Sequence, residues 1–151
     1  MKKIDNTEFV KKYDSLYFQS LSVFGALNKS FIDHIVKNSD TLLVEPGDIL
    51  FQENQYADCF YVLIDGRIFI YKGSRLHNQK TITLTKGECL GIVSMLCMQP
   101  FPGDAVSEEH TTVIRIGNEL YASLPVIDGD QFSIFMMNLA RNMGRVQLRT
   151  I

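Results

Sequence analysis

Short β-rich runs separated by turn signals fill the chain from residue 41 to 116, and they constrain its fold more than any other feature. Pro46 and Gly47 separate two apolar runs, and Asp65 and Gly66 separate two more. Proline presets φ for a turn and glycine permits a positive φ, so both pairs predict tight turns between strands. Asp-Gly in this setting is also a strong hairpin signal. Turns that recur about every eight to twelve residues are typical of a β-sandwich or barrel.

Helical periodicity brackets this β-rich region. Between about residues 6 and 37 apolar residues recur at helical spacing, with Asn28 and Ser30 as candidate caps of a second helix. From about 128 to 151 an apolar seam has the 4-3 spacing of a coiled coil. The seam consists of Phe132, Met136, Leu139, Met143 and Val146. It predicts a helix that forms a homodimer or, as the alternative, packs on its own β-domain by the same face.

A length of 151 residues predicts one domain, with helices over about 6–37, a β-roll over about 41–125 and a C-terminal helix over about 128–151. A composition of 46% apolar and 21% charged residues excludes intrinsic disorder. The net charge of −2 argues against a domain whose main role is to grip nucleic-acid phosphates. No secretion signal is visible, and no apolar run approaches the ~18 residues that span a bilayer. We therefore expect a cytoplasmic protein that does not bind membranes.

The pattern of reactive residues gives little support to an enzyme. His34, His77 and His110 are isolated from one another, whereas a jelly-roll metal site needs several converging His and carboxylate ligands. No nucleophile elbow, phosphate-binding P-loop or zinc-protease motif is present. The three cysteines have no paired spacing and predict small buried side chains in a reducing compartment. We expect no catalytic residue, metal or cofactor, and a jelly-roll enzyme is the weakest alternative.

A binding site has better support after the strand that ends near Leu84. Gly87 and Gly91 stand four residues apart, an apolar stretch follows over 92–98, and a Pro- and Gly-containing loop leads into the next strand. A glycine that leads into a short helix leaves free backbone N–H groups, which can bind an anion. The alternative is an ordinary strand connection with one helical turn, and the residues alone leave both interpretations open.

The order of these segments resembles the cyclic-nucleotide-binding domain, as in Crp/Fnr-type regulators, protein kinase A regulatory subunits and nucleotide-gated channels. Residues 44–51 are similar to that family's Pro-Gly-Asp turn and following strand, and 53–58 to its Gly-Glu-x-x-Asp loop. Residues 60–66 are similar to its tyrosine-containing strand, and 86–91 to the approach to its phosphate-binding cassette. The resemblance extends from about Leu21 to the C-terminus. It implies a mainly β jelly roll (double-stranded β-helix) with N-terminal helices and a long C-terminal dimerisation or lid helix.

The chain departs from this family where the nucleotide would bind. The resemblance implies a Glu after Gly91 for the ribose 2′-hydroxyl and, further along the loop, an Arg for the cyclic phosphate. This chain has Ile92 at the first position and Phe101 or Pro102 at the second. Residues 86–110 contain one lysine and four acidic residues, a local net charge of −3. Because a phosphate would lose charge-assisted hydrogen bonds of about 1.5–3 kcal/mol each and meet carboxylates, we expect weak or no binding of cyclic AMP and cyclic GMP.

Two interpretations of the altered cassette remain. In the first, cassette-equivalent residues line a cavity for an apolar or aromatic effector other than a cyclic nucleotide: Gly91, Ile92, Val93, Met95, Phe101, Pro102 and Gly103. In the second, Ile92 and Phe101 fill the former site and close it, because apolar side chains pack together.

The expected role is a non-catalytic regulatory or ligand-sensing domain of the Crp/Fnr type that forms a homodimer through its C-terminal helix. The alternative is a ligand-free dimerisation module. The sequence shows no helix-turn-helix after the last helix, so we expect no direct DNA binding by this chain. The chain is either complete or the excised effector domain of a larger regulator.

Overall fold

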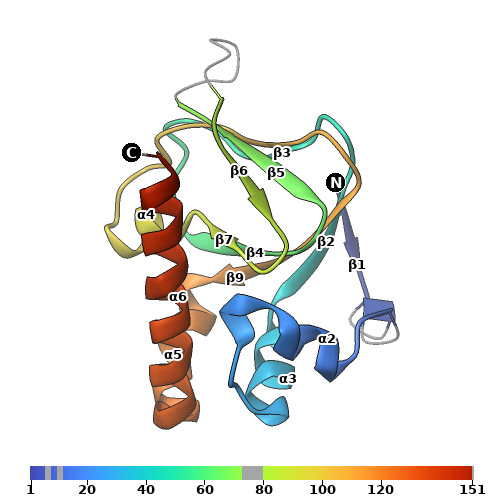
Figure 1. The fold of residues 1–151 in the computed structure, drawn as a ribbon, viewed down its shortest axis with the longest axis vertical. Coiled ribbons are helices and arrows are strands. Elements are labelled where there is room, and N and C mark those ends of the chain that lie inside the picture. The colour runs from blue at the N-terminus through green and yellow to red at the C-terminus, as the bar shows by residue number, and fades with distance from the viewer. Residues whose placement is uncertain (6–7, 10–11, 73–79, 151) are drawn as a thin grey trace.

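The computed structural model describes the chain except residues 6–7, 10–11, 73–79 and 151. Its strands form two antiparallel sheets that curl into a roll (Figure 1). The first sheet has the strand order β1 (Lys2–Ile4), β2 (Asp40–Val44), β9 (Thr111–Gly117), β4 (Cys59–Asp65) and β7 (Cys89–Leu90). The second has the order β3 (Ile49–Phe51), β8 (Ala105–Ser107), β5 (Arg67–Tyr71) and β6 (Lys80–Thr85).

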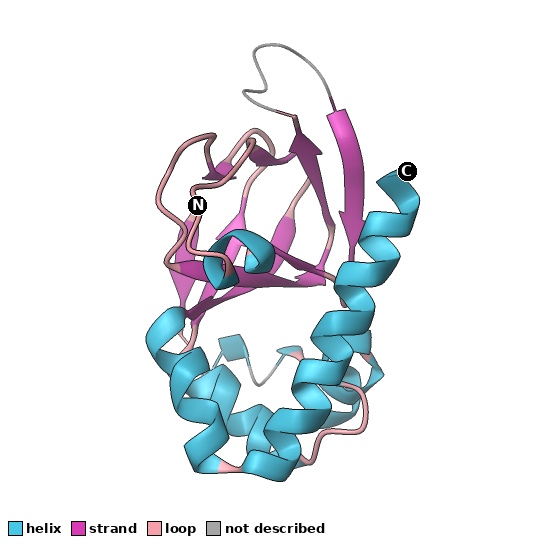
Figure 2. Cartoon of the chain, turned by 90° about the vertical axis from the view of Figure 1, so that its left-hand side faces the viewer, coloured by secondary structure: helices cyan, strands magenta, loops and turns pink. Residues whose placement is uncertain are grey.

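Helices gather at one end of the roll, and one long helix continues along its side (Figure 2). The end is formed by α2 (Ser15–Ser20), the 3-10 turn η1 (Ser22–Phe24), α3 (Lys29–Asn38) and α5 (Asn118–Ile127). The short helix α4 (Ile92–Leu96) follows β7, and α6 (Gly129–Thr150) is the long helix. Mainly β structure with flanking helices, as the sequence predicts, is therefore confirmed.

Side-chain caps explain where three of these helices begin. Asn28 Oδ1 accepts a hydrogen bond from Phe31 N at 2.8 Å, so the cap predicted at Asn28 is confirmed. Asp14 Oδ1 caps α2 in the same way at 2.8 Å. Asp128 Oδ1 accepts from Gln131 N at 3.1 Å, at the start of α6. Each cap satisfies an N–H group that the first helical turn leaves without a partner.

The strand β4 is buried on both of its faces and divides the core into two parts. Successive side chains of a strand point to opposite faces, so an uninterrupted apolar strand can supply two cores. One face joins the core under the helices through Phe60, Val62 and Ile64. The other face joins the core inside the roll through Cys59, Tyr61 and Leu63. We call these the helix-side core and the roll core.

The turn at Asp65 and Gly66 is a corner between sheets and not the hairpin that the sequence predicts. The strand before it, β4, pairs with β7 and β9, whereas β5 after it pairs with β6 and β8. Gly66 has a φ of 101°, and a Cβ there would lie 2.5 Å from Thr111 Oγ1. The close approach of β9 therefore requires glycine. The turn at Gly47 also joins the two sheets, and here the predicted tight turn between strands is confirmed.

Two boundaries differ from the sequence prediction. The predicted β-roll of 41–125 ends at Gly117, because residues 118–127 form α5. Pro125 lies near the end of this helix, where a proline is a helix-stop signal and weakens the helical pattern. The N-terminal region also begins with β1, which pairs with β2 in the first sheet. The predicted C-terminal helix of 128–151 agrees with α6, which spans Gly129–Thr150, and residue 151 lies outside the described residues.

The apolar seam of α6 packs against the chain's own body. Leu139 is fully buried in the helix-side core, and Phe132, Met136 and Met143 pack against that core. Val146 packs against the roll core. The seam therefore makes the intramolecular contact that the sequence offers as the alternative, and the shared dimer seam stays a prediction. The 4-3 spacing fits both arrangements, since it specifies only that one helical face is apolar.

A pair of glycine substitutions tests the corner at Gly66. Gly66→Ala is expected to lower the free energy of unfolding by about 3 kcal/mol, because left-handed strain of roughly 1–2 kcal/mol adds to a steric clash. Gly47 has a φ of 91°, but a Cβ there would have nothing within 4 Å, so Gly47→Ala is expected to cost only about 1–2 kcal/mol. Urea unfolding followed by circular dichroism measures both. Equal losses would contradict the close approach at Gly66.

Candidate ligand-binding site

A cavity of about 250 Å³ lies between the roll, the α4 segment and α6. Cassette-equivalent residues predicted from the sequence surround it: Gly91, Ile92, Val93, Phe101, Pro102 and Gly103. Met95, which the sequence also places on this wall, is instead buried in the helix-side core. The structure thus brings residues from the start of α4 and from the loop after it together around one cavity.

Sequence reasoning missed the walls that come from elsewhere in the chain. The roll supplies Phe51 and Leu84, and α6 supplies Asn142, Met143 and Val146. The apolar runs of the strands indicate that such residues face inward, but they do not indicate which of them reach the cavity. The α6 wall has no local signal at all, because it depends on how the helix packs on the roll.

Gly91 is the residue that allows the cavity wall to form. It has a φ of 86° and lies at the N-terminus of α4, where Met95 N donates to its carbonyl oxygen at 3.2 Å. A Cβ at Gly91 would lie 3.0 Å from Phe101 Cε1 and 3.4 Å from Phe51 Cε2. Glycine therefore satisfies both the left-handed backbone and the close approach of two rings.

Phe101 and Ile92 occupy part of the space, and a cavity remains beside them. Each side chain is only 2% exposed. The ring of Phe101 stacks on Phe51 with a centroid distance of 3.8 Å and an interplanar angle of 12°. Packing of these two residues is what the second sequence interpretation predicts, whereas an open space beside them is what the first predicts. The structure therefore combines features of both.

The cavity wall is uncharged over the residues that the structure describes. None of the four acidic residues counted between 86 and 110 lines it. Glu88 forms an ion pair with Arg149 at 2.7 Å, and Asp104 Oδ1 accepts from Glu53 N at 2.8 Å. The expectation that a phosphate would meet carboxylates here is therefore corrected. The described wall offers a phosphate neither a carboxylate nor a charged partner.

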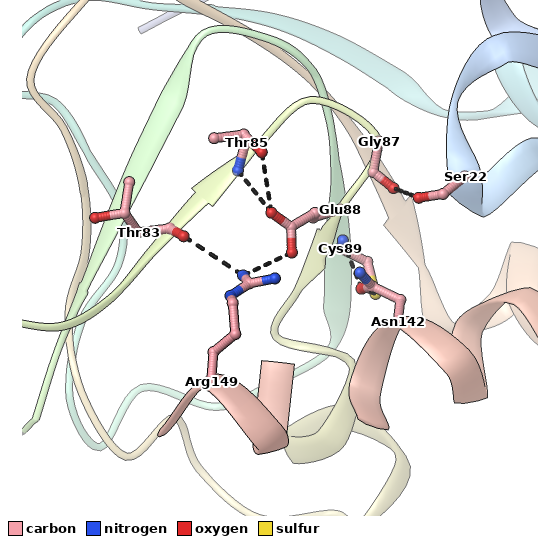
Figure 3. A network of polar contacts seen from close by, with 8 residues as sticks. All are labelled: Ser22, Thr83, Thr85, Gly87, Glu88, Cys89, Asn142 and Arg149. Atoms are coloured by element: carbon pink, nitrogen blue, oxygen red, sulfur yellow. Dashed lines mark hydrogen bonds and ion pairs between the residues drawn. The ribbon is translucent and has the colours of Figure 1, made fainter. Parts of the chain in front are cut away.

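Two polar contacts fasten α6 beside the cavity (Figure 3). Arg149 Nη2 donates to Glu88 Oε2 at 2.7 Å, near the C-terminal end of the helix. Roughly two turns earlier, Asn142 Oδ1 accepts from both Cys89 N at 2.9 Å and Cys89 Sγ at 2.7 Å. Both contacts reach the β6–β7 region of the roll. Sequence spacing does not reveal either pair, since their members lie 61 and 53 residues apart.

The cysteines differ in exposure. Burial raises the pKa of Cys89 to about 12, so this thiol stays protonated at neutral pH and can donate to Asn142. Burial also raises the pKa of Cys59. Cys97 is exposed at the end of α4, contrary to the prediction that the three thiols are buried.

Within the described part of the chain, no three His, Cys, Asp or Glu side chains lie close enough to hold a metal ion. His110 Nδ1 lies 2.8 Å from Glu45 Oε2, and His34 Nδ1 lies 3.4 Å from Asn38 Nδ2. His77 is outside the described residues. No helix in the described ranges has the length and apolar character needed to cross a membrane.

Comparison with known proteins gives a consistent result. The sequence model of the family described as "Cyclic nucleotide-binding domain" matches residues 41–124. A cGMP-dependent protein kinase from Plasmodium berghei (strain Anka) is 23% identical over 139 residues. The match covers 92% of this chain but 15% of the kinase, so the chain spans a small part of that relative's length.

Solved structures share the fold at low sequence identity. A cyclic nucleotide-binding domain from Methylobacillus flagellatus has a TM-score of 0.75 and 14% identity, over 90% of this chain and 81% of that one. The sensor domain of the transcriptional regulator DNR from Pseudomonas aeruginosa has a TM-score of 0.64 and 20% identity, over 86% and 91%. These likenesses confirm the predicted jelly-roll fold. Because the family's model also covers more than half of its 151 residues, the chain belongs to the cyclic nucleotide-binding domain family.

Proposed function

We propose that this chain is a non-catalytic regulatory domain that senses an apolar small molecule other than a cyclic nucleotide. The observation that carries the proposal is the uncharged cavity beside Gly91, where Phe101 or Pro102 stands at the position that the family resemblance assigns to an arginine. An uncharged wall favours an apolar ligand, because an unpaired charge is costly to bury. The DNR domain, described as the sensor domain of a transcriptional regulator, supports a sensing role by analogy.

The helix α6 would carry the signal. Asn142, Met143 and Val146 form one wall of the cavity, so a ligand that enters it contacts the helix directly. The opposite side of α6 is exposed, at Met137 and Leu148 for example. A ligand that favours one position of α6 over another would therefore change the surface that the domain presents to a partner.

Two further expectations from the sequence belong to this proposal. We propose that residues 1–151 act as one domain, because α6 contacts both the helix-side core and the roll core. We also propose a reducing location such as the cytoplasm. Its support is that Cys59, Cys89 and Cys97 are all free thiols.

The exposed face of α6 supports a homodimer as a second part of the proposal. Met137 and Leu148 are 53% and 72% exposed, and they align along the helix with Ala140 and Gly144. A Cβ at Gly144 would have nothing within 4 Å, so this part of the helix has room for a neighbour. A second copy of the chain would pack on this apolar and small-residue face, which we call the outer face of α6. A ligand-free dimerisation module is the alternative function.

A fluorescent probe tests the sensing cavity. We expect 1-aminonaphthalene, a neutral dye that is brighter in apolar surroundings, to bind the wild-type protein. Val146→Phe fills the cavity from α6 and is expected to weaken binding at least about tenfold, since filled space leaves no room for the ring. Val126→Phe is the matched control, because Val126 is 88% exposed on α5. The same affinity in all three proteins would contradict the proposed site.

Calorimetry tests the exclusion of cyclic nucleotides. Cyclic AMP and cyclic GMP are expected to bind with dissociation constants weaker than about 1 mM, because the wall offers the phosphate no charged partner. A low-micromolar dissociation constant for either nucleotide would refute this prediction.

Light scattering tests the dimer. Leu148→Lys places a charge on the outer face of α6 and is expected to convert a dimer into a monomer, because an unpaired charge in an interface is unfavourable. Leu16→Lys on α2 is the control, since Leu16 is 74% exposed and lies on another helix. A monomeric wild-type protein, or a dimer that survives Leu148→Lys, would count against this interface.

A further inference from the structure

Asn142 is the most deeply buried polar side chain on the cavity wall. It is 1% exposed and comes from α6, the proposed signalling helix. Its carboxamide has one acceptor oxygen and two N–H donors on Nδ2. The oxygen accepts from Cys89 N and Cys89 Sγ, at 2.9 and 2.7 Å. Since a backbone N–H can only donate, this contact decides which end of the amide is oxygen and which is nitrogen.

The Nδ2 group of Asn142 donates no hydrogen bond to any residue in the described ranges. Asn138, one turn earlier on α6, shows the contrast. Its Nδ2 donates to Val23 O at 3.1 Å and to Gly25 O at 2.8 Å, so both N–H donors of that amide have partners. Among the described residues, the one fully buried side-chain nitrogen or oxygen without a partner is Thr41 Oγ1, so Asn142 Nδ2 keeps some accessible surface. The cavity that Asn142 lines is the place where a partner for its Nδ2 can lie.

The rest of the wall limits what that partner can be. The wall is uncharged, so a charged ligand would gain no ion pair there. Phe51, Leu84 and Val146 present apolar surface. The Cys89 thiol stays protonated, since burial raises its pKa to about 12. A volume of about 250 Å³ exceeds the ~150 Å³ that suffices to hold benzene in an apolar protein cavity.

We propose that the cavity takes a neutral, mostly apolar molecule of about one or two aromatic rings in size, with a carbonyl-type oxygen that accepts a hydrogen bond from Asn142 Nδ2. This inference rests on the proposed function and names the ligand class of the same site. Asn142 then selects for the ligand's oxygen. The same amide would also link the ligand to β7. Its Nδ2 would donate to the ligand, while its Oδ1 accepts from Cys89.

Two probes of the same shape test the proposal. Acetophenone carries a carbonyl oxygen, and α-methylstyrene has a CH₂ group in its place. The measured quantity is the ratio of the two dissociation constants, obtained by ligand-observed NMR titration of the full chain. Asn142→Leu is expected to shift this ratio against acetophenone by about fivefold, the effect of one hydrogen bond. Gln147→Leu makes the same kind of change at an exposed residue of α6 that does not line the cavity; it is the control and should leave the ratio unchanged.

The outcomes separate the two levels of the proposal. If both probes bind and Asn142→Leu leaves the ratio unchanged, the role of Asn142 is overturned while the cavity stands. If neither probe binds the folded wild-type protein, both the role of Asn142 and the sensing cavity are overturned.

Asn142→Leu removes the acceptor of Cys89 N, so this variant can fail to fold. In that case a measurement on the wild-type protein tests the inference. Acetophenone is expected to shift the side-chain amide ¹⁵N–¹H signals of Asn142, whereas α-methylstyrene shifts them less. The Asn138 amide signals serve as the internal control, because both Asn138 contacts lie outside the cavity wall. An acetophenone response at Asn142 no larger than that of α-methylstyrene overturns the inference.

Discussion

Burial of β4 on both faces is the constraint on which the remaining structure depends. Its alternating side chains enter the helix-side core through Phe60 and the roll core through Tyr61. Because β4 also pairs with β9 and β7, both cores are tied to one stretch of backbone. The N-terminal helices and α6 then cover the first core, and the second sheet covers the other. A strand with only one apolar face could not hold both layers together.

The cavity lies where these two layers meet α6. Gly91 follows β7, so its position is set by the pairing of β7 with β4. The left-handed backbone at Gly91 lets Phe51 and Phe101 stack beside it, and α6 closes the remaining side with Asn142 and Val146. The site is thus assembled from three segments that are distant in sequence. Under the proposed function, a ligand in the cavity would therefore lie against all three segments.

Electrostatics in this site differ from those expected of a phosphate-binding one. The cavity wall is uncharged over its described residues, and the nearby carboxylate of Glu88 is neutralised by Arg149. This ion pair and the Asn142–Cys89 hydrogen bonds hold α6 against the roll without placing a charge in the cavity. The fold of the family is therefore retained, while the chemistry at the cassette-equivalent positions is that of an apolar pocket.

The sequence by itself determined the local features. Periodicity predicted α6, turn residues predicted the bend at Gly47, and the order of segments placed Gly91 and Phe101 at one site. These features depend on neighbouring residues, whose spacing and backbone preferences are visible in the chain.

Only the tertiary structure decided which surfaces meet. In the tertiary structure, Gly66 lies at a corner between the two sheets and not in a hairpin. Leu139 is buried in the core of its own chain, and Cys97 is exposed. The tertiary structure also pairs Arg149 with Glu88 across 61 residues. A periodic pattern specifies that a face is apolar but not what covers it, because that choice depends on contacts between segments far apart in the sequence.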